Sequence, residues 1–198
     1  MGLFEKTGID IPGEANSIMH NKKNVGAVEL ATMSFGQSFQ ITPLQLMRAA
    51  SAAVNGGTLV TPHFGMKAVD SSGKTVKTFE FAKKKNVIKK ETSETMRELL
   101  EAVVSEGSGR NCKIEGYSIG GKTATSEKLP RGTGKYISSF LGFSKAEHPT
   151  VMALVMIDEP KGTYYGGTIA APVVREVFKV ALPYLGISKD YTVDKTKK

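Results

Sequence analysis

The sequence predicts an α+β fold, and three of its features support that prediction. A central stretch has apolar residues at the spacing of one helix face and is followed by Gly107; these residues are Met96, Leu99, Leu100, Val103 and Val104. Three extended runs come next, over residues 117–125, 136–143 and 151–157. Residues 146–149 are a suitable hairpin connection, so the last two runs are expected to be antiparallel neighbours.

The first part of the chain predicts a turn-rich segment, a helix and strands. Roughly the first forty residues are rich in turn formers, which predicts an irregular segment that packs on something else. Thr42 and Pro43 predict a helix start, as N-cap and first residue, and residues 55–57 predict its end. One face of this helix is expected to carry Leu44, Met47, Ala50 and Val54. Residues 58–81 predict strands, two of them joined by a turn at 70–73.

The end of the chain predicts a covered strand and a last helix. The run over residues 151–157 is apolar at successive positions, which predicts cover on both of its faces. A helix is expected to start near Pro172, and Pro183 is expected to kink or end it. Its apolar residues are Val173, Val174, Val177, Phe178 and Ala181.

Composition predicts one compact globular unit and excludes several classes of protein. The chain has 198 residues, of which 40% are hydrophobic and 23% charged, ordinary values for a folded domain. No apolar run approaches the roughly 18 residues of a membrane-spanning helix, and residues 1–6 do not read as a signal peptide. A single cysteine, Cys112, excludes an internal disulfide and a zinc finger and is expected to be a partly buried small residue.

The net charge of +8 does not predict nucleic-acid binding. Much of it lies in residues 83–85 with 89–90, and in Lys195, Lys197 and Lys198. Neither cluster is interleaved with aromatic residues, and no helix carries a basic stripe. A solvated basic surface that favours anionic partners is the expectation.

One motif predicts nucleotide binding and is kept as an alternative. Residues 116–123 match the phosphate-loop pattern G-x-x-x-x-G-K-[ST], and Asp158 ends an apolar run as a magnesium ligand would. A phosphate loop requires a strand before it and a helix after it. Residues 110–115 do not read as a buried strand, and Pro130 leaves little room for a helix, so the context disfavours this interpretation.

Five segments, in this order, resemble the C-terminal part of the transpeptidase domain of class B penicillin-binding proteins. These are the peptidoglycan D,D-transpeptidases of sporulation and division. The segments are Glu5–Glu14, Ser34–Gln37 with Ile41–Gln45, Lys122–Lys128, Tyr136–Phe143 with Asp158–Pro160, and Tyr165–Gly167 with Ala170–Pro172. The resemblance covers nearly all of residues 1–198 and implies the penicillin-binding fold, an antiparallel sheet packed by helices, incomplete without its upstream half.

The resemblance places the family's Lys-Thr-Gly motif at Lys122, Thr123 and Ala124, followed by Thr125. It implies that these four residues line the substrate and that Lys122, Thr123 and Thr125 serve catalysis. The Lys122 ammonium would attract the substrate carboxylate, the two threonine hydroxyls would bind it, and the Thr125 N–H would donate to the oxyanion. Ala124 replaces the motif glycine, which adds a methyl beside the ligand. A literal Lys-Thr-Gly at residues 6–8 is expected to be a structural loop.

The family's other two motifs are missing from this sequence. Its only Ser-x-x-Lys is Ser71–Lys74, in a predicted turn that neither shelters a serine nor desolvates a lysine, and Ser-x-Asn does not occur. This chain alone is therefore expected to be inactive, and a non-catalytic interaction fragment is a further alternative.

The resemblance also implies the ligands, the partner and the location of the chain. It implies D-Ala-D-Ala stem peptides and β-lactams as ligands, no cofactor or metal, and the upstream half as partner. The implied location is the outer face of the bacterial cell membrane. Sheet surface left uncovered predicts self-association.

Overall fold

The computed structural model describes residues 1–144 and 148–191, and these residues form two compact units. The first unit comprises residues 1–93 and the second begins at Glu94. The length alone predicted a single unit. Helix α3 (Lys90–Ser105) contains the boundary, so its first turn belongs to the first unit and the rest of it to the second.

The first unit contains the predicted helix, α2 (Pro43–Val54), with the predicted N-cap. The Thr42 hydroxyl accepts from the Gln45 N–H at 3.1 Å, and the Gln45 side-chain oxygen accepts from the Thr42 N–H at 2.8 Å. The predicted buried face was partly wrong: the buried residues are Gln45, Ala49, Ala52 and Val54. Gln45 can be buried because its amide also donates to the Glu5 carbonyl at 3.1 Å.

The predicted irregular segment contains helix α1 (Ala27–Ser34) and a short 3₁₀ turn, η1 (Lys22–Asn24). The Gly26 N–H donates to the Glu29 carboxylate at 2.9 Å, which caps the start of α1. None of the α1 side chains is buried, and Val28 is 70% exposed. The helix therefore depends on its cap more than on packing, and its weak apolar pattern gave no clear signal.

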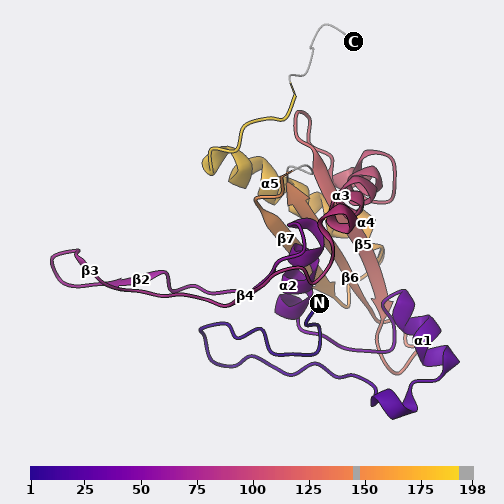
Figure 1. Ribbon diagram of the computed structural model, residues 1–198. Helices are drawn as coiled ribbons and strands as arrows, with labels where there is room; N and C mark the ends of the chain where they lie inside the picture. The colour runs from indigo at the N-terminus through magenta and orange to yellow at the C-terminus, as the bar shows by residue number, and fades with distance from the viewer. Residues whose placement is uncertain (145–147, 192–198) are drawn as a thin grey trace, which may run out of the picture. The chain divides into compact units, whose positions relative to one another are not determined.

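Four short strands complete the first unit: β1 (Leu59–Val60), β2 (Lys67–Val69), β3 (Thr75–Thr78) and β4 (Lys83–Lys84). Strands β2 and β3 pair antiparallel around the predicted turn, where the Asp70 carboxylate accepts from the Ser72 and Lys74 N–H groups at 2.9 and 3.0 Å. Strands β1 and β4 also pair antiparallel, which was not predicted. Figure 1 shows β2 and β3 as a long two-stranded projection.

The second unit is built on a three-stranded antiparallel sheet, as predicted. Its strands are β5 (Ile119–Glu127), β6 (Tyr136–Ser144) and β7 (Met152–Asp158), in the order β5-β6-β7. A 3₁₀ turn, η2 (Arg110–Cys112), precedes β5, and two helices follow β7: α4 (Gly166–Ile169) and α5 (Ala171–Tyr184). Residues 145–147 of the predicted hairpin connection lie outside the described residues.

Helix α5 lies against β6 and β7, and their side chains form the core of the second unit (Figure 1). Phe140, Val174, Phe178 and Leu182 are fully buried there. Cys112 is also fully buried, more than predicted, and burial raises the pKa of its thiol to about 12. Pro183 lies in the last turn of α5, one residue before its end.

Three burial predictions in the second unit were wrong. Leu99 on the predicted apolar face of α3 is 59% exposed, whereas Val104 is buried. Strand β7 is not covered on both faces, because Met156 is 44% exposed. On α5, Val173 and Val177 are 44% and 47% exposed, and the buried row is instead Ala171, Val174, Phe178 and Leu182.

Among the described residues, no helix is long and apolar enough to cross a membrane.

Candidate functional site

The predicted motif strand is the edge strand of its sheet. Within the described residues, β5 pairs with β6 and with no other strand. The Glu159 N–H, just after β7, donates to the Tyr136 carbonyl of β6. The backbone N–H and C=O groups of even-numbered β6 residues therefore point to β7, and those of odd-numbered residues point to β5. By the β5–β6 register, the backbone groups of Lys122 and Ala124 therefore pair with β6. Those of Thr123 and Thr125 point to the open edge.

Side chains along β5 alternate between the two sheet faces. Thr123 and Thr125 lie on one face, the face on which Phe140 and Gly142 pack toward α5. Lys122 and Ala124 lie on the other face, and both are exposed. The Lys122 ammonium donates to the Thr123 carbonyl at 2.7 Å, which brings the charge to the open edge.

Gly120 and Gly121 have a structural role that excludes the phosphate-loop interpretation. A Cβ on Gly120 would lie 2.2 Å from the Phe143 ring, and one on Gly121 would lie 2.4 Å from the Phe140 ring. Both glycines are inside β5, with no helix directly after the strand. The glycines make room for aromatic rings, so the structure does not support the alternative of a phosphate loop over residues 116–123.

Thr123 and Thr125 line a pocket of about 340 Å³ in the second unit. The other lining residues are Ser108, Arg110, Asn111, Tyr165, Gly166, Gly167 and Thr168. The hydroxyls of Ser108 and Thr123 lie 3.0 Å apart, within hydrogen-bond distance. The Thr125 hydroxyl accepts from the Gly166 N–H at 3.1 Å. That bond leaves the Thr125 hydroxyl proton available to a ligand oxygen.

The start of α4 is packed directly on the motif strand. A Cβ on Gly166 would lie 2.3 Å from the Ser139 carbonyl oxygen and 2.4 Å from that of Ala124. The Asn111 amide donates to the Gly167 carbonyl at 2.8 Å, and the Ser138 hydroxyl donates to the Tyr164 carbonyl. These contacts fix one wall of the pocket against β5 and β6.

Three tyrosines extend this wall. The Tyr136 and Tyr164 rings are stacked with centroids 4.2 Å apart, and the Tyr164 and Tyr165 rings lie 4.7 Å apart. Tyr165 is 58% exposed and lines the pocket. The wall therefore offers an aromatic surface beside the hydroxyl groups.

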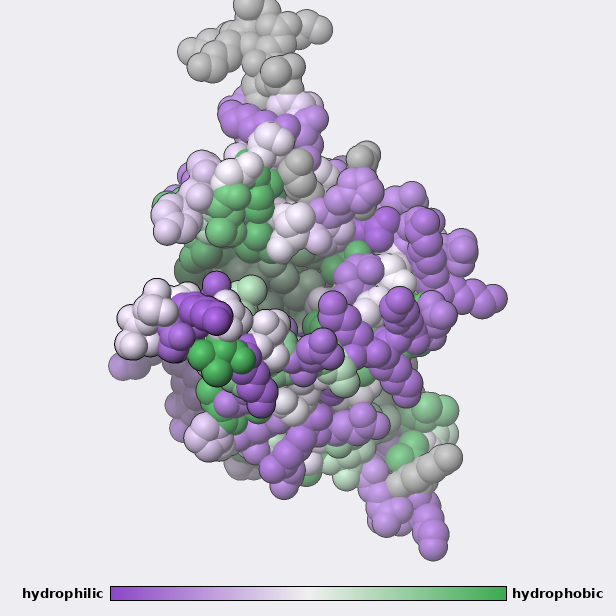
Figure 2. Space-filling view, turned by 60° about the vertical axis from the view of Figure 1, so that its left-hand side comes forward, coloured by the Kyte–Doolittle hydropathy of each residue, from purple (hydrophilic) through white to green (hydrophobic). Residues whose placement is uncertain are grey.

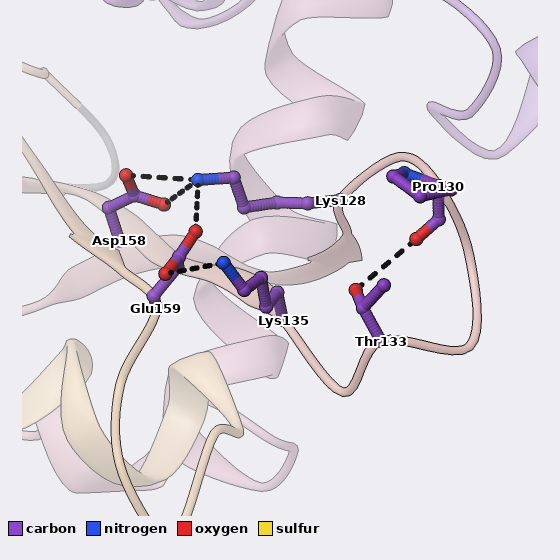
Figure 3. Close-up of polar contacts among 6 residues, drawn as sticks. All are labelled: Lys128, Pro130, Thr133, Lys135, Asp158 and Glu159. Atoms are coloured by element: carbon purple, nitrogen blue, oxygen red, sulfur yellow. Dashed lines mark hydrogen bonds and ion pairs between the residues drawn. The ribbon is translucent and has the colours of Figure 1, made fainter.

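Charged side chains connect the end of β5, the start of β6 and the end of β7 (Figure 3). Lys128 contacts Asp158 at 2.9 Å and Glu159 at 2.8 Å, and Lys135 contacts Glu159 at 3.4 Å. The bonds to Glu159 and Asp158 raise the pKa of Lys128, and the bonds from Lys128 and Lys135 lower the pKa of Glu159. Asp158, the magnesium ligand of the nucleotide alternative, is thus an ion-pair partner at the end of the hairpin.

Comparison with known proteins gives the family. The family model of the penicillin-binding protein transpeptidase domain matches residues 1–179. The chain belongs to the penicillin-binding protein transpeptidase family. Stage V sporulation protein D of Bacillus subtilis is 47% identical over 191 residues, which cover 94% of this chain and 30% of the relative. The probable peptidoglycan D,D-transpeptidase PenA of Neisseria flavescens is 35% identical, over 95% of this chain and 46% of the relative.

Solved structures agree with the family assignment. The transpeptidase domain of Burkholderia pseudomallei penicillin-binding protein 3 has a TM-score of 0.79 and 29% identity, covering 96% of this chain and 56% of that one. The predicted fold, a part of the transpeptidase fold, is therefore confirmed. The chain spans about a third to a half of the length of the curated relatives it matches.

The structure brings together part of the predicted site. Thr123 and Thr125 share the pocket, whereas Lys122 and Ala124 lie on the opposite face of β5. Sequence reasoning missed Ser108, Arg110 and Asn111, which precede the motif and reach it only through the fold. The Tyr165–Gly167 segment carried the resemblance, but no role in the site was predicted for it.

The two competing motifs are loops. Thr7, in the literal Lys-Thr-Gly, is buried, and its N–H donates to Glu14 at 2.6 Å, which confirms the predicted structural role. Ser71–Lys74 lies in the exposed β2–β3 turn, away from any helix. Over residues 1–144 and 148–191, no three or more His, Cys, Asp or Glu side chains group as metal ligands would.

Proposed function

We propose that this chain provides the substrate-lining strand of a peptidoglycan D,D-transpeptidase, which cross-links stem peptides by serine acyl transfer and binds β-lactams. The observation that supports the proposal best is the open edge of β5, where the Thr125 N–H is unpaired by the sheet beside the hydroxyls of Thr123 and Thr125. Membership of the family and the names of its relatives agree with it.

The proposed roles follow from the geometry of β5. A substrate that extends along the open edge would place its carboxylate at the Thr123 and Thr125 hydroxyls. The Lys122 ammonium, held at the edge by its bond to the Thr123 carbonyl, supplies the opposite charge. The Thr125 N–H stabilises the developing oxyanion, a contribution of about 100- to 1,000-fold in rate. Ala124 lines the same edge from the Lys122 face.

The acylated serine is supplied by sequence outside these 198 residues. The only Ser-x-x-Lys in the chain is in the exposed β2–β3 turn, where no side chain shelters the lysine amine. We therefore expect no benzylpenicillin adduct on this chain alone in intact-protein mass spectrometry. A stoichiometric adduct would show that the chain contains its own nucleophile and contradict this assignment.

A chimera tests the proposed activity. Residues 1–198 replace the matching segment of Bacillus subtilis stage V sporulation protein D, and labelling by a fluorescent penicillin is followed over time. We expect covalent labelling, and Lys122→Ala should slow it about 10- to 150-fold, the equivalent of one charged hydrogen bond. Lys113→Ala, at an exposed lysine outside β5 and outside the pocket lining, is the matched control. A folded chimera without label, or equal rates for both variants, would refute the proposal.

Two further properties are proposed from the family. The chain acts on the outer face of the bacterial cell membrane, which a membrane-impermeant label on intact cells can test. It also self-associates or pairs with its upstream half through β7, whose Met156 is exposed and which pairs only with β6 in the described residues. A monomer in light scattering would contradict self-association.

A further inference from the structure

The β2–β3 projection, which we call the arm, comprises residues 62–85. Among the described residues β2 and β3 pair only with each other, so each has an unpaired outer edge, whereas β4 at the base of the arm pairs with β1. All residues of both strands are exposed. Figure 1 shows the arm as a thin two-stranded ribbon with β2 and β3 toward its tip. An isolated two-stranded ribbon has no core of its own, so its surface is available for contacts.

The arm carries half of the net charge of the chain. It contains six lysines, three of which (83–85) lie in and beside β4 at its base, against Asp70 and Glu80, a formal net charge of +4 out of +8. The Asp70 carboxylate is directed into the turn, where it accepts three hydrogen bonds. Lys67 and Lys77 are exposed on the two paired strands themselves. The arm is therefore a strongly basic surface.

One face of the arm is apolar as well as basic. Lys77 is opposite Ala68 in the ladder, and the Phe79 N–H donates to the Met66 carbonyl, which places Phe64, Met66, Lys77 and Phe79 on a common face. Phe64 and Met66 are each 73% exposed, and Phe79 is 38% exposed. The Lys77 ammonium lies 5.3 Å from the centre of the Phe79 ring. Figure 2, turned to bring the side of the arm forward, shows exposed apolar side chains bordered by hydrophilic ones.

The base of the arm is fixed to the first unit. The Asp10 carboxylate accepts from the Phe64 N–H at 2.9 Å and from the Gly65 N–H at 2.7 Å. These bonds lower the pKa of Asp10. The His63 and Phe81 rings are stacked with centroids 3.8 Å apart. A fixed base presents the face at a defined place and lowers the entropic cost of binding.

We propose that the arm is a docking surface for an acidic, partly apolar polypeptide segment of another protein. A carboxylate of the partner would pair with Lys77 while its apolar side chains cover Phe64, Met66 and Phe79 on the same face. A carboxylate that projects to the other side of an added strand would reach Lys67 on the opposite face. An extended segment suits the site, because the unpaired edges of β2 and β3 can accept a further strand. This inference is independent of the proposed transpeptidase activity.

Other occupants fit the arm less well. A second copy is disfavoured because two arms of charge +4 repel each other, and strand lysines oppose edge-to-edge pairing. A membrane is disfavoured because the tip, residues 70–73, is polar, and the largest exposed apolar side chains, Phe64, Met66 and Phe79, lie toward the base rather than beside the tip. A polyanion such as nucleic acid would leave the apolar face without a partner.

The test uses the full chain and a fluorescent peptide of Glu-Glu-Val-Val repeats, which presents Glu and Val on both sides of an extended strand. Binding is followed by anisotropy. We expect this peptide to bind more tightly than poly-Glu, and a Lys–Val peptide not to bind. Lys67→Gln with Lys77→Gln should weaken binding about 2- to 30-fold, the range for two exposed ion pairs. Phe64→Ser with Met66→Ser should remove the preference over poly-Glu. Lys113→Gln with Lys161→Gln makes the same charge change in the second unit and should leave binding unchanged.

Several results would overturn the proposal. The first is that the parent chain does not bind the Glu–Val peptide. The second is that the control pair of variants weakens binding as much as the arm lysine variants do. The third is that poly-Glu binds as tightly as the Glu–Val peptide, which would show that charge attraction alone causes binding. Tighter binding to anionic lipid vesicles that depends on Phe64 and Met66 would assign the arm to membranes. A dimer abolished by the arm variants would assign it to a second copy. Because the substituted side chains are exposed, circular dichroism should show an unchanged fold for every variant.

Discussion

The contact between α4 and the motif strand can be tested by adding one methyl group. In Gly166→Ala the new Cβ would lie 2.3 Å from the Ser139 carbonyl oxygen and 2.4 Å from the Ala124 carbonyl oxygen. Both obstacles are strand backbone, so α4 must move away by about 1 Å to restore an ordinary contact. That movement also lengthens the 3.1 Å hydrogen bond from the Gly166 N–H to the Thr125 hydroxyl beyond a bonding distance.

The steric contact and the lost hydrogen bond together determine how much Gly166→Ala lowers the free energy of unfolding. Overpacking at a tight site costs about 1–3 kcal/mol, and a lost hydrogen bond about 1 kcal/mol, so unfolding should become easier by about 2–4 kcal/mol. For a chain of this size the expected fall in Tm is about 4–16 °C. Thermal unfolding followed by circular dichroism measures it. Thr163→Ala, an exposed position just before α4, is the control and should change stability by less than about 0.5 kcal/mol.

The outcome of this substitution decides whether α4 is packed on β5. A melting curve for Gly166→Ala that coincides with the Thr163→Ala curve would refute the packing. A methyl carbon cannot lie 2.3 Å from a backbone oxygen, so α4 would have to move and the stability would fall. A large fall with an unchanged Tyr136–Tyr164 stack, detected by near-ultraviolet circular dichroism, would place the disturbance at the strand contact alone.

Three other predictions concern the core, the charged cluster and the motif. Phe178→Ala, at a fully buried position, should destabilise the chain by about 3–5 kcal/mol in urea unfolding; a loss below about 1 kcal/mol would contradict the described core. Because the Glu159 pKa is lowered, its contribution to stability is present above the ordinary glutamate pKa and is lost as pH falls through the lowered value. Carbon NMR titration should therefore show Glu159 ionised at lower pH than a free glutamate, and Lys128→Ala should move its pKa back toward the ordinary range. Ala124→Gly should change penicillin labelling of the chimera by less than about tenfold, or 1.4 kcal/mol, because the methyl lies on the face opposite the Thr123–Thr125 pocket; a larger increase would show that the methyl obstructs the ligand.

The elements that the sequence predicted correctly are those whose signals are local. Thr42, Pro43 and residues 55–57 specify the start and end of α2 through caps that depend only on neighbouring residues. The three strands of the second unit were recognisable from apolar runs separated by turns. The five family segments in their correct order were sufficient to predict the fold and the family, because each segment is a local sequence pattern.

The features that sequence reasoning missed depend on distant contacts. Gln45 is buried because a carbonyl forty residues away accepts from its amide, which no helical period reveals. Lys83 and Lys84 form a strand because Leu59 and Val60 pair with them, although their side chains predicted only a solvated basic surface. In the same way, Ser108 and Arg110 reach the pocket because the chain around η2 packs on α4 and α5, and no motif connects them to Thr123.

The alternation of side chains along β5 restricts where a ligand can lie. Lys122 is on one face of the sheet and Thr125 on the other, so a ligand placed over either face reaches only one of them. Only at the open edge do the Lys122 ammonium, the Thr125 hydroxyl and the Thr125 N–H become accessible together. Backbone pairing along that edge would hold a peptide in a fixed register, with its carboxylate at the pocket. A group that attacks such a peptide must therefore approach from beyond the edge, from residues that β5 itself does not carry.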